Sequence, residues 1–114
     1  MKEKIEKEEL GYKVLKALEE EPEISQRRLS KRLNISLGMI NYLIKELAKK
    51  GLVKIENFKK SNNKLAYRYL LTPKGIEEKA RLTYHFLKRK MREYERLQKE
   101  IEELKRELGK DELS

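Results

Sequence analysis

The sequence predicts a mainly α-helical fold with one small β-hairpin, an α+β class, followed by a single long helix. Three observations support this prediction. Apolar residues recur with a period of about 3.6 through most of the chain, as on one face of a helix. Residues 53–56 and 67–71 instead alternate with a period of 2, which is typical of strands. After Gly75 neither proline nor glycine occurs until Gly109, so nothing interrupts a helix that begins at Pro73.

The composition excludes several classes of protein. The 114 residues include no cysteine and one histidine, His85, which removes disulfides, thiolate metal sites and histidine pairs. No glycine-rich phosphate loop or nucleophile motif occurs, so we expect no enzyme activity, no metal and no cofactor. No apolar run approaches the ~20 residues that cross a bilayer. We therefore expect a cytoplasmic protein that does not bind membranes.

The positive charge is concentrated in the middle of the chain. The formal net charge is +9, and residues 22–75 alone carry 13 basic and 3 acidic residues, a net of +10. Residues 1–21 carry −2 and residues 76–114 carry +1. A surface that merely favours lysine is one explanation. A field concentrated in one segment more often attracts a polyanion, and it is the usual electrostatic sign of nucleic-acid binding.

Three helices are expected before the hairpin. The first covers about residues 6–20, and the second begins after Ser25. The third, 36–50, begins at Ser36 and ends at Gly51. Each serine is a typical N-cap and is flanked by apolar residues spaced as a hydrophobic staple. Two short helices joined by about three residues form a helix-turn-helix.

The third helix divides into two sides on a helical wheel. The side expected in the core consists of Leu37, Ile40, Leu43, Ile44 and Leu47. The opposite side consists of Gly38, Asn41, Tyr42, Lys45 and Lys49. Asparagine can pair with an adenine edge, lysine and tyrosine reach phosphates or base acceptors, and glycine permits close backbone approach. An ordinary solvated face is the alternative, but in so charged a chain such a face would carry glutamate, and this one carries none.

Two further groups extend this candidate DNA surface. The second helix carries a cluster of arginines, and in a helix-turn-helix this element crosses the phosphate backbone. The hairpin tip, 58–65, is basic and could lie along an adjacent groove, although a solvated loop would have a similar composition. The DNA-binding candidates are Ser25, Gln26, Arg27, Arg28, Ser36, Gly38, Asn41, Tyr42, Lys45, Lys49, Lys60, Asn62, Asn63 and Lys64.

The long helix, 73–108, has an apolar seam with the spacing of a coiled coil. Its 36 residues would extend about 54 Å. We expect domains at 1–72 and 73–114, the second for dimerisation. The seam does not fix whether paired helices run parallel or antiparallel. The dimerisation candidates are Leu87, Tyr94, Leu97, Ile101, Leu104 and Leu108.

Several segments together resemble a known family. Residues 24–36 (ISQRRLSKRLNIS), 44–53 (IKELAKKGLV) and 69–75 (YLLTPKG) are similar to winged helix-turn-helix regulators of the MarR type. The chain as a whole further resembles a short subset associated with exopolysaccharide gene clusters. The resemblance implies a homodimer on a pseudo-palindromic operator, with the third helix in the major groove and the hairpin, or wing, near the minor groove.

Two features follow from this resemblance. The DNA-contact positions it implies are Ser36, Gly38, Asn41, Tyr42 and Lys45, together with residues 60–64 of the wing. Typical members also bind small aromatic effectors in a dimer domain built from helices at both ends. This chain has a short first helix and one long last helix, so an effector stays uncertain.

We therefore expect a sequence-specific regulator, most readily a repressor, that binds double-stranded DNA as a homodimer. The alternative is a non-catalytic adaptor that uses the winged helix as a scaffold and the long helix as a coiled-coil partner. Non-specific RNA binding is a weaker third hypothesis, because the sequence contains no RNA-module motif.

Overall fold

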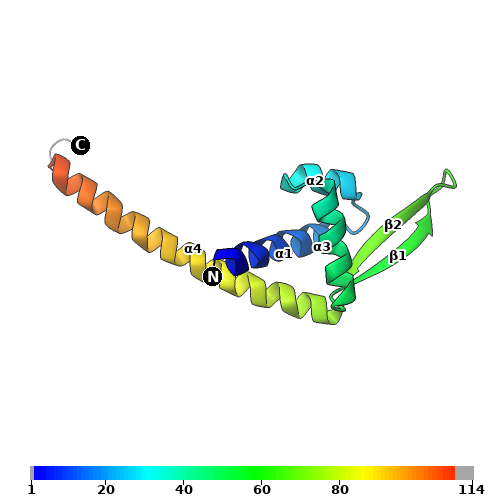
Figure 1. Ribbon diagram of the computed structural model, residues 1–114. Coiled ribbons are helices and arrows are strands. Elements are labelled where there is room, and N and C mark those ends of the chain that lie inside the picture. The colour runs from blue at the N-terminus through cyan, green and yellow to red at the C-terminus, as the bar shows by residue number, and fades with distance from the viewer. Residues whose placement is uncertain (1, 110–114) are drawn as a thin grey trace. The chain divides into compact units, whose positions relative to one another are not determined.

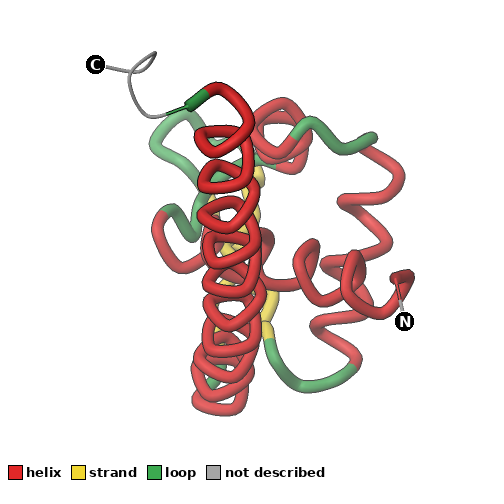
Figure 2. The backbone as a smooth tube through the Cα atoms, turned by 90° about the vertical axis from the view of Figure 1, so that its left-hand side faces the viewer, coloured by secondary structure: helices red, strands yellow, loops and turns green. Residues whose placement is uncertain are grey.

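The computed structural model describes residues 2–109 and confirms the predicted fold class (Figure 1). Helix makes up most of the backbone (Figure 2). The expected second domain, 73–114, ends in residues 110–114, which lie outside the described residues. The elements are α1 (Lys2–Glu20), α2 (Gln26–Leu33), α3 (Leu37–Lys49), β1 (Val53–Lys59), β2 (Leu65–Leu71) and α4 (Pro73–Leu108).

The ends of α2 and α3 form as the sequence predicts. The hydroxyls of Ser25 and Ser36 each accept a hydrogen bond from the backbone N–H three residues later, at 3.1 Å. At the other end of α2, Asn34 adopts the left-handed conformation with φ 55°. Gly51 does the same after α3, with φ 77°. Because the N–H of Leu52 then reaches the Leu47 carbonyl at 2.9 Å, the last turn of α3 closes as a Schellman motif.

The hairpin is longer than its alternating pattern indicated. Strands β1 and β2 pair antiparallel from Val53↔Leu71 to Lys59↔Leu65. Phe58, Lys59 and Leu65, which we placed in the 58–65 tip, therefore belong to the strands. The connection itself is the short polar stretch 60–64, which has no hydrophobic alternation to reveal where pairing stops.

The two ends of the hairpin are fastened at one place. The Thr72 hydroxyl donates to the Gly51 carbonyl at 2.6 Å, and the Thr72 backbone N–H donates to the Leu52 carbonyl at 3.0 Å. Thr72 also caps α4 by accepting from the Gly75 N–H at 3.0 Å. A Cβ on Gly75 would lie 2.0 Å from the Leu52 oxygen, so only glycine fits there. The end of α3 and the start of α4 are thus locked together.

The core is formed by α1, α2, α3, the base of the hairpin and the start of α4. Its fully buried members include Leu15, Leu18, Ile24, Leu29 and Ile40. Leu15 and Leu18 belong to α1, the expected first helix. That helix begins earlier than expected, at Lys2 rather than near residue 6.

Three apolar residues are more exposed than the sequence indicated. Leu37, predicted in the core, is 45% exposed, because it is the first residue of α3 and lies at the edge of the apolar arc. Ile76, in the first turn of α4, is 53% exposed. Tyr67 is 49% exposed, because the outer part of the hairpin extends beyond the core, whereas Tyr69 nearer its base is buried.

The described chain divides into two compact units, one up to Thr83 and one from Tyr84 onward. The first eleven residues of α4 belong to the first unit, in which Leu82 is buried against the core. The functional boundary at 72/73 stays a prediction. In the second unit the expected seam is exposed throughout, between 48% and 63% for its six members. Tyr84 and Met91 are also exposed in that segment, at 58% and 53%.

Candidate nucleic-acid interface

Helix α3 separates an apolar side from a polar one. Ile40 and Ile44 are almost fully buried, while Tyr42 is 52% exposed. Lys45 and Lys49 are also exposed, and within residues 2–109 neither forms an ion pair. Their charges are therefore available to an external anion. Gly38 has open space around it, so nothing in the protein would prevent another backbone from approaching it.

Asn41 differs from its neighbours on this side of α3. It is half-buried, and its Nδ2 donates a hydrogen bond to the Gln26 Oε1 at 3.2 Å. The Gln26 Nε2 in turn donates to the Tyr69 hydroxyl at 3.3 Å. Gln26 and Asn41, which were predicted as two separate contact residues, are thus brought together by the fold. The Asn41 amide has two N–H donors and one carbonyl oxygen, so one N–H and the oxygen are not used in this bond.

The helix N-termini carry serines whose capping role is already filled. Ser25 and Ser36 are exposed, and each hydroxyl oxygen accepts from a backbone N–H. Each hydroxyl hydrogen is not used in that bond and can be donated to a phosphate oxygen. The geometry is compatible with the predicted contacts, and the same serines have a sufficient structural reason in helix capping.

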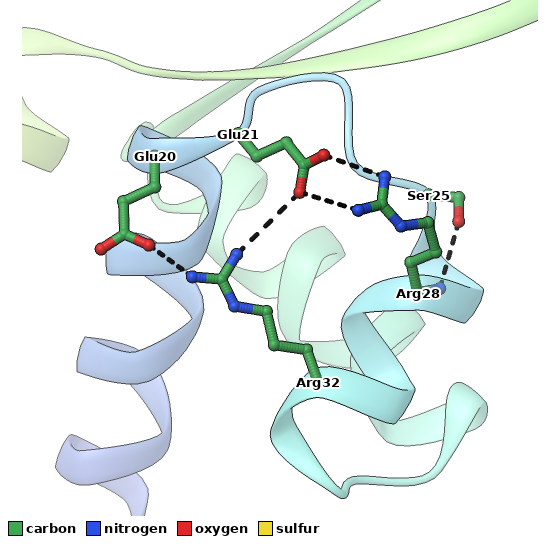
Figure 3. Close-up of polar contacts among 5 residues, drawn as sticks. All are labelled: Glu20, Glu21, Ser25, Arg28 and Arg32. Atoms are coloured by element: carbon green, nitrogen blue, oxygen red, sulfur yellow. Dashed lines mark hydrogen bonds and ion pairs between the residues drawn. The ribbon is translucent and has the colours of Figure 1, made fainter.

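The arginines of α2 are not equivalent (Figure 3). The Arg28 guanidinium donates to the Glu21 carboxylate at 2.9 Å and 3.4 Å. Arg32 pairs with Glu20, and its second contact, to Glu21, is 3.9 Å. Arg27 is exposed and has no ion pair among the residues that the structure describes. The sequence placed these bases in one cluster, and the structure distinguishes an unpaired Arg27 from a neutralised Arg28.

The hairpin tip is held by its own backbone. The Lys60 N–H donates to the Lys64 carbonyl at 2.9 Å, and the Asn63 N–H donates to the Lys60 carbonyl at 2.8 Å. Asn63 has φ 63°, and the Asn62 Oδ1 accepts from the Lys64 N–H at 3.3 Å. Both asparagines therefore have a turn-forming role. The exposed lysines at 60 and 64 remain as candidates for contact with an anion.

A cleft of about 560 Å³ lies between the hairpin and helices α2 and α3. Asn41 and Lys45 line it on the helix side, and Ile55, Leu65 and Tyr67 line it on the hairpin side. The paired positions Ile55↔Tyr69 and Lys59↔Leu65 place these hairpin residues on one face of the ladder. The alternation of residues 67–71 did not indicate this face, because a period of 2 does not show how far the hairpin extends beyond the core.

Two exposed apolar residues at the start of α3 were also missed. Leu37 is 45% exposed and Met39 is 43% exposed, beside the N-cap Ser36. Leu37 precedes Asn41 by four residues, so the two are neighbours on the helix surface. The N-terminal residues of a recognition helix are those that contact base edges, and apolar side chains there can contact a thymine methyl group. That positional rule is the signal that could have identified Leu37.

Residues 2–109 contain neither a group of metal-ligating side chains nor a membrane-spanning helix. No group of three or more histidine, aspartate or glutamate side chains there is arranged to hold a metal ion. None of the described helices is both long and apolar enough to span a membrane.

Sequence comparison places the helix-turn-helix in a known class. Residues 7–54 match a family model described as winged helix-turn-helix DNA-binding. This segment contains α2 and α3 and the beginning of β1. No curated protein sequence gives a significant match.

Solved structures share the fold over most of the chain. A MarR family protein of Mycobacterium tuberculosis, in complex with salicylic acid, is 19% identical with a TM-score of 0.61, covering 87% of this chain and 75% of its own. The transcriptional regulator BldR of Sulfolobus solfataricus is 25% identical with a TM-score of 0.55, covering 86% and 71%. The adhesin competence repressor AdcR of Streptococcus pyogenes is 23% identical with a TM-score of 0.56, covering 86% and 74%.

The expected similarity to a subset associated with exopolysaccharide gene clusters is not confirmed by these comparisons. The family model covers most of α1, all of α2 and α3 and the start of β1, whereas the similarity to the solved structures extends over most of the chain. Residues 7–54 are therefore similar to winged helix-turn-helix DNA-binding domains, and the chain has the fold of the MarR-family structures.

Proposed function

We propose that this protein is a sequence-specific DNA-binding transcription regulator that acts as a homodimer. The observation that carries the proposal is the polar side of α3. It presents Asn41, Tyr42 and Lys45 opposite a buried apolar side, within the segment that holds a net charge of +10. A helix of this width and polarity fits the major groove, where each base pair has its own pattern of donors and acceptors.

The remaining candidates would position the protein rather than read sequence. Arg27 on α2 and the lysines at 60 and 64 of the tip are exposed cations on either side of α3 in the chain. Contacts of this kind go to phosphates and fix orientation on the duplex. We propose that α2 crosses the backbone beside the major groove and that the tip lies on adjacent backbone or in the minor groove.

The exposed seam of the second unit supports a homodimer. Six apolar side chains with coiled-coil spacing are each about half exposed, and pairing two copies would cover them. A symmetric pair presents two identical reading helices, which suits two half-sites about one helical turn apart. A dimer bound across an operator occupies DNA that polymerase needs, so we propose repression as its effect.

Salt dependence tests whether the protein binds DNA through phosphates. If a dimer contacts ~6–10 phosphates, affinity should fall about 10³–10⁵-fold between 50 and 200 mM salt. Gel-shift titrations of DNA fragments recovered from a random-sequence selection would measure this. Binding that does not change with salt, or a selection that enriches no sequence, would overturn the proposal.

Two substitutions distinguish base reading from phosphate contact. Asn41→Ala should reduce the preference among sequences, because it removes the amide that pairs with adenine. Lys31→Ala, on the exposed side of α2, should weaken binding to all sequences alike. The opposite pattern would place the reading residues elsewhere than on α3.

The exposed seam also favours a second candidate, a protein-interaction adaptor. In that case the long helix pairs with a helix of a different protein, and the basic face of α3 has no ligand. Size-exclusion chromatography with light scattering separates the two functions. A dimer at micromolar concentration agrees with the regulator, whereas a monomer that binds no DNA agrees with the adaptor.

A further inference from the structure

Three side chains from three different elements form a continuous hydrogen-bonded chain behind the polar side of α3. Asn41 on α3 donates to Gln26, the first residue of α2, and Gln26 donates to Tyr69 on β2. The two distances are 3.2 Å and 3.3 Å, and both bonds are partly buried. The chain therefore connects the helix that faces the proposed DNA site to the base of the hairpin.

The inner end of this chain is firmly held. Tyr69 is only 4% exposed and belongs to the core cluster. Its backbone N–H donates to the Pro22 carbonyl at 2.9 Å, and it pairs with Ile55 across the ladder. Gln26 follows directly after the N-cap Ser25, so its backbone is fixed by the start of α2. Each link is thus attached to a rigid element rather than to a loop.

Hydrogen-bonding capacity decides what Asn41 can still do. Its amide has two N–H donors and one carbonyl oxygen, and one N–H is engaged by Gln26. One N–H and the Oδ1 remain, which is the donor–acceptor pair that matches N7 and N6 of adenine. The Gln26 Oε1 accepts from Asn41 and one of the two Gln26 N–H groups donates to Tyr69, so both ends of this amide are held within the protein.

We propose that Gln26 is a positioning residue that orients the Asn41 amide, before DNA arrives, for pairing with adenine. This inference rests on the proposed function and goes beyond it by assigning a second residue to the specificity of α3. The terminal torsion of asparagine has a broad distribution when nothing restrains it. Restraining it in the free protein removes an ordering cost of about 0.5–1.5 kcal/mol on binding, a factor of about 2–10 in affinity.

The first experiment measures base preference. The wild-type protein is used to select a preferred site, and each position is then replaced by the other three bases. Asn41→Ala identifies the position at which adenine is read, where the wild type should discriminate by about 5- to 150-fold. Gln26→Ala should reduce the discrimination at that position about 2- to 10-fold and leave the other positions unchanged. The double variant should be no worse than Asn41→Ala alone.

Matched variants separate orientation from folding and from charge. Gln26→Glu keeps an acceptor for the Asn41 N–H, so adenine preference should persist while the added negative charge weakens binding to every sequence. Tyr69→Phe removes one hydroxyl and should reduce the preference in part, at the same position. Arg27→Ala, beside Gln26 in sequence, should lower affinity uniformly, because Arg27 makes no contact with Asn41. Circular dichroism establishes that each variant is folded.

A second measurement needs no DNA. In the free protein, nitrogen-15 relaxation of the Asn41 side-chain amide, assigned by its loss in Asn41→Asp, should report restricted motion. Gln26→Ala should make that amide mobile on the nanosecond timescale, with the α3 backbone unchanged. An amide that is equally mobile in both proteins would overturn the positioning role, whatever the DNA results.

The outcomes of the binding experiment are separable. If Gln26→Ala weakens binding equally for all bases, or flattens a different position, then Gln26 acts as a phosphate contact or as a reader, and the inference is wrong. If the wild type enriches no sequence, the proposed function fails, and the adenine reading that Gln26 is assigned to support fails with it.

Discussion

The two compact units of the chain use apolar residues in opposite ways. In the first unit the apolar positions of α1, α2 and α3 close on one another, and every buried apolar residue of the described chain lies there. In the second unit the apolar positions from Leu87 to Leu108 are all about half exposed. The same residue types thus form a finished core in one unit and an uncovered surface in the other. The first unit therefore has a buried core of its own, and the apolar surface of the second unit would be covered in the proposed homodimer.

The contacts described within residues 84–109 run along the helix itself. Ion pairs along this segment join Lys90 to Glu93 at 3.3 Å and Glu102 to Lys105 at 3.9 Å. Such exposed pairs are worth about 0.2–0.5 kcal/mol each on a helix surface. An extended helix obtains most of its stability from packing an amphipathic face. We therefore expect the largest effects of mutation where that face would be covered.

Leu97→Glu should have the largest effect, because a charge in the seam of the second unit should prevent two copies from pairing. The protein should become monomeric by light scattering, and DNA affinity should fall by about 10²–10⁴-fold as two-site binding is lost. The first unit should keep its folding transition. Lys99→Gln, on the opposite side of the helix, changes the charge equally and should leave a dimer. A Leu97→Glu protein that remains dimeric would show that the dimer uses another surface.

Gly75→Ala should act on the first unit instead. A Cβ there would lie 2.0 Å from the Leu52 oxygen, so either the end of α3 or the start of α4 must move. We expect a loss of about 3 kcal/mol in the free energy of unfolding, measured with urea. Gly38→Ala is the control, because nothing lies within 4 Å of its added methyl group. It should leave stability unchanged or raise it by up to about 1 kcal/mol, yet weaken DNA binding if the backbone approaches DNA there.

Arg27→Ala and Arg28→Ala test whether ion pairing within the first unit determines which cations reach DNA. Arg27 has no described ion pair, whereas Arg28 is held by Glu21 at 2.9 Å. Two lost phosphate contacts in a dimer should lower the slope of log affinity against log salt by about 1.8 for Arg27→Ala. Arg28→Ala should change this slope less. Equal slopes for the two variants would mean that Arg28 leaves Glu21 when DNA binds.

Leu37→Ala tests an apolar side chain of the first unit that is exposed rather than buried in the core. Because Leu37 is 45% exposed, stability should change by less than about 0.5 kcal/mol. If Leu37 contacts a thymine methyl group, replacing that thymine by deoxyuridine should cost the wild type about fourfold in affinity. The variant should not respond to the same replacement. A wild type that tolerates deoxyuridine at every position would remove Leu37 from the DNA surface.

Local signals in the sequence predicted much of the fold. Ser25 and Ser36 cap helices as their spacing indicated, because capping depends on a few adjacent residues. The bounds of α4 followed from Pro73 and Gly109 for the same reason. These features depend on contacts within one turn, which a single sequence contains in full.

Features that depend on the distance from the core were not predictable in this way. The helical wheel assigned Leu37 to the core because of its angle around the helix axis. Burial also requires another element to pack beside that turn of the helix, and Leu37 is exposed. Similarly, alternation placed Tyr67 with Tyr69, although only the latter reaches the core. The hydrogen bond between Gln26 and Asn41 joins residues 15 apart on two helices, and the spacing of apolar residues does not predict that these two side chains meet. The candidate surface on α3 was predicted as a set of residues, and its internal connections came from the structure.

The contacts among Gly51, Leu52, Thr72 and Gly75 fix both ends of the hairpin at one place, so its outer part projects from the first unit as an arm. Because the arm leaves and returns at the same point, its length has no effect on where α3 ends or α4 begins. Deleting two residues from each strand near the tip would keep each remaining side chain on its face and shorten the arm by about 7 Å. Homologous domains could thus differ in reach while their reading helices stay superimposable, and arms could be exchanged between such proteins to change spacing without redesigning the interior.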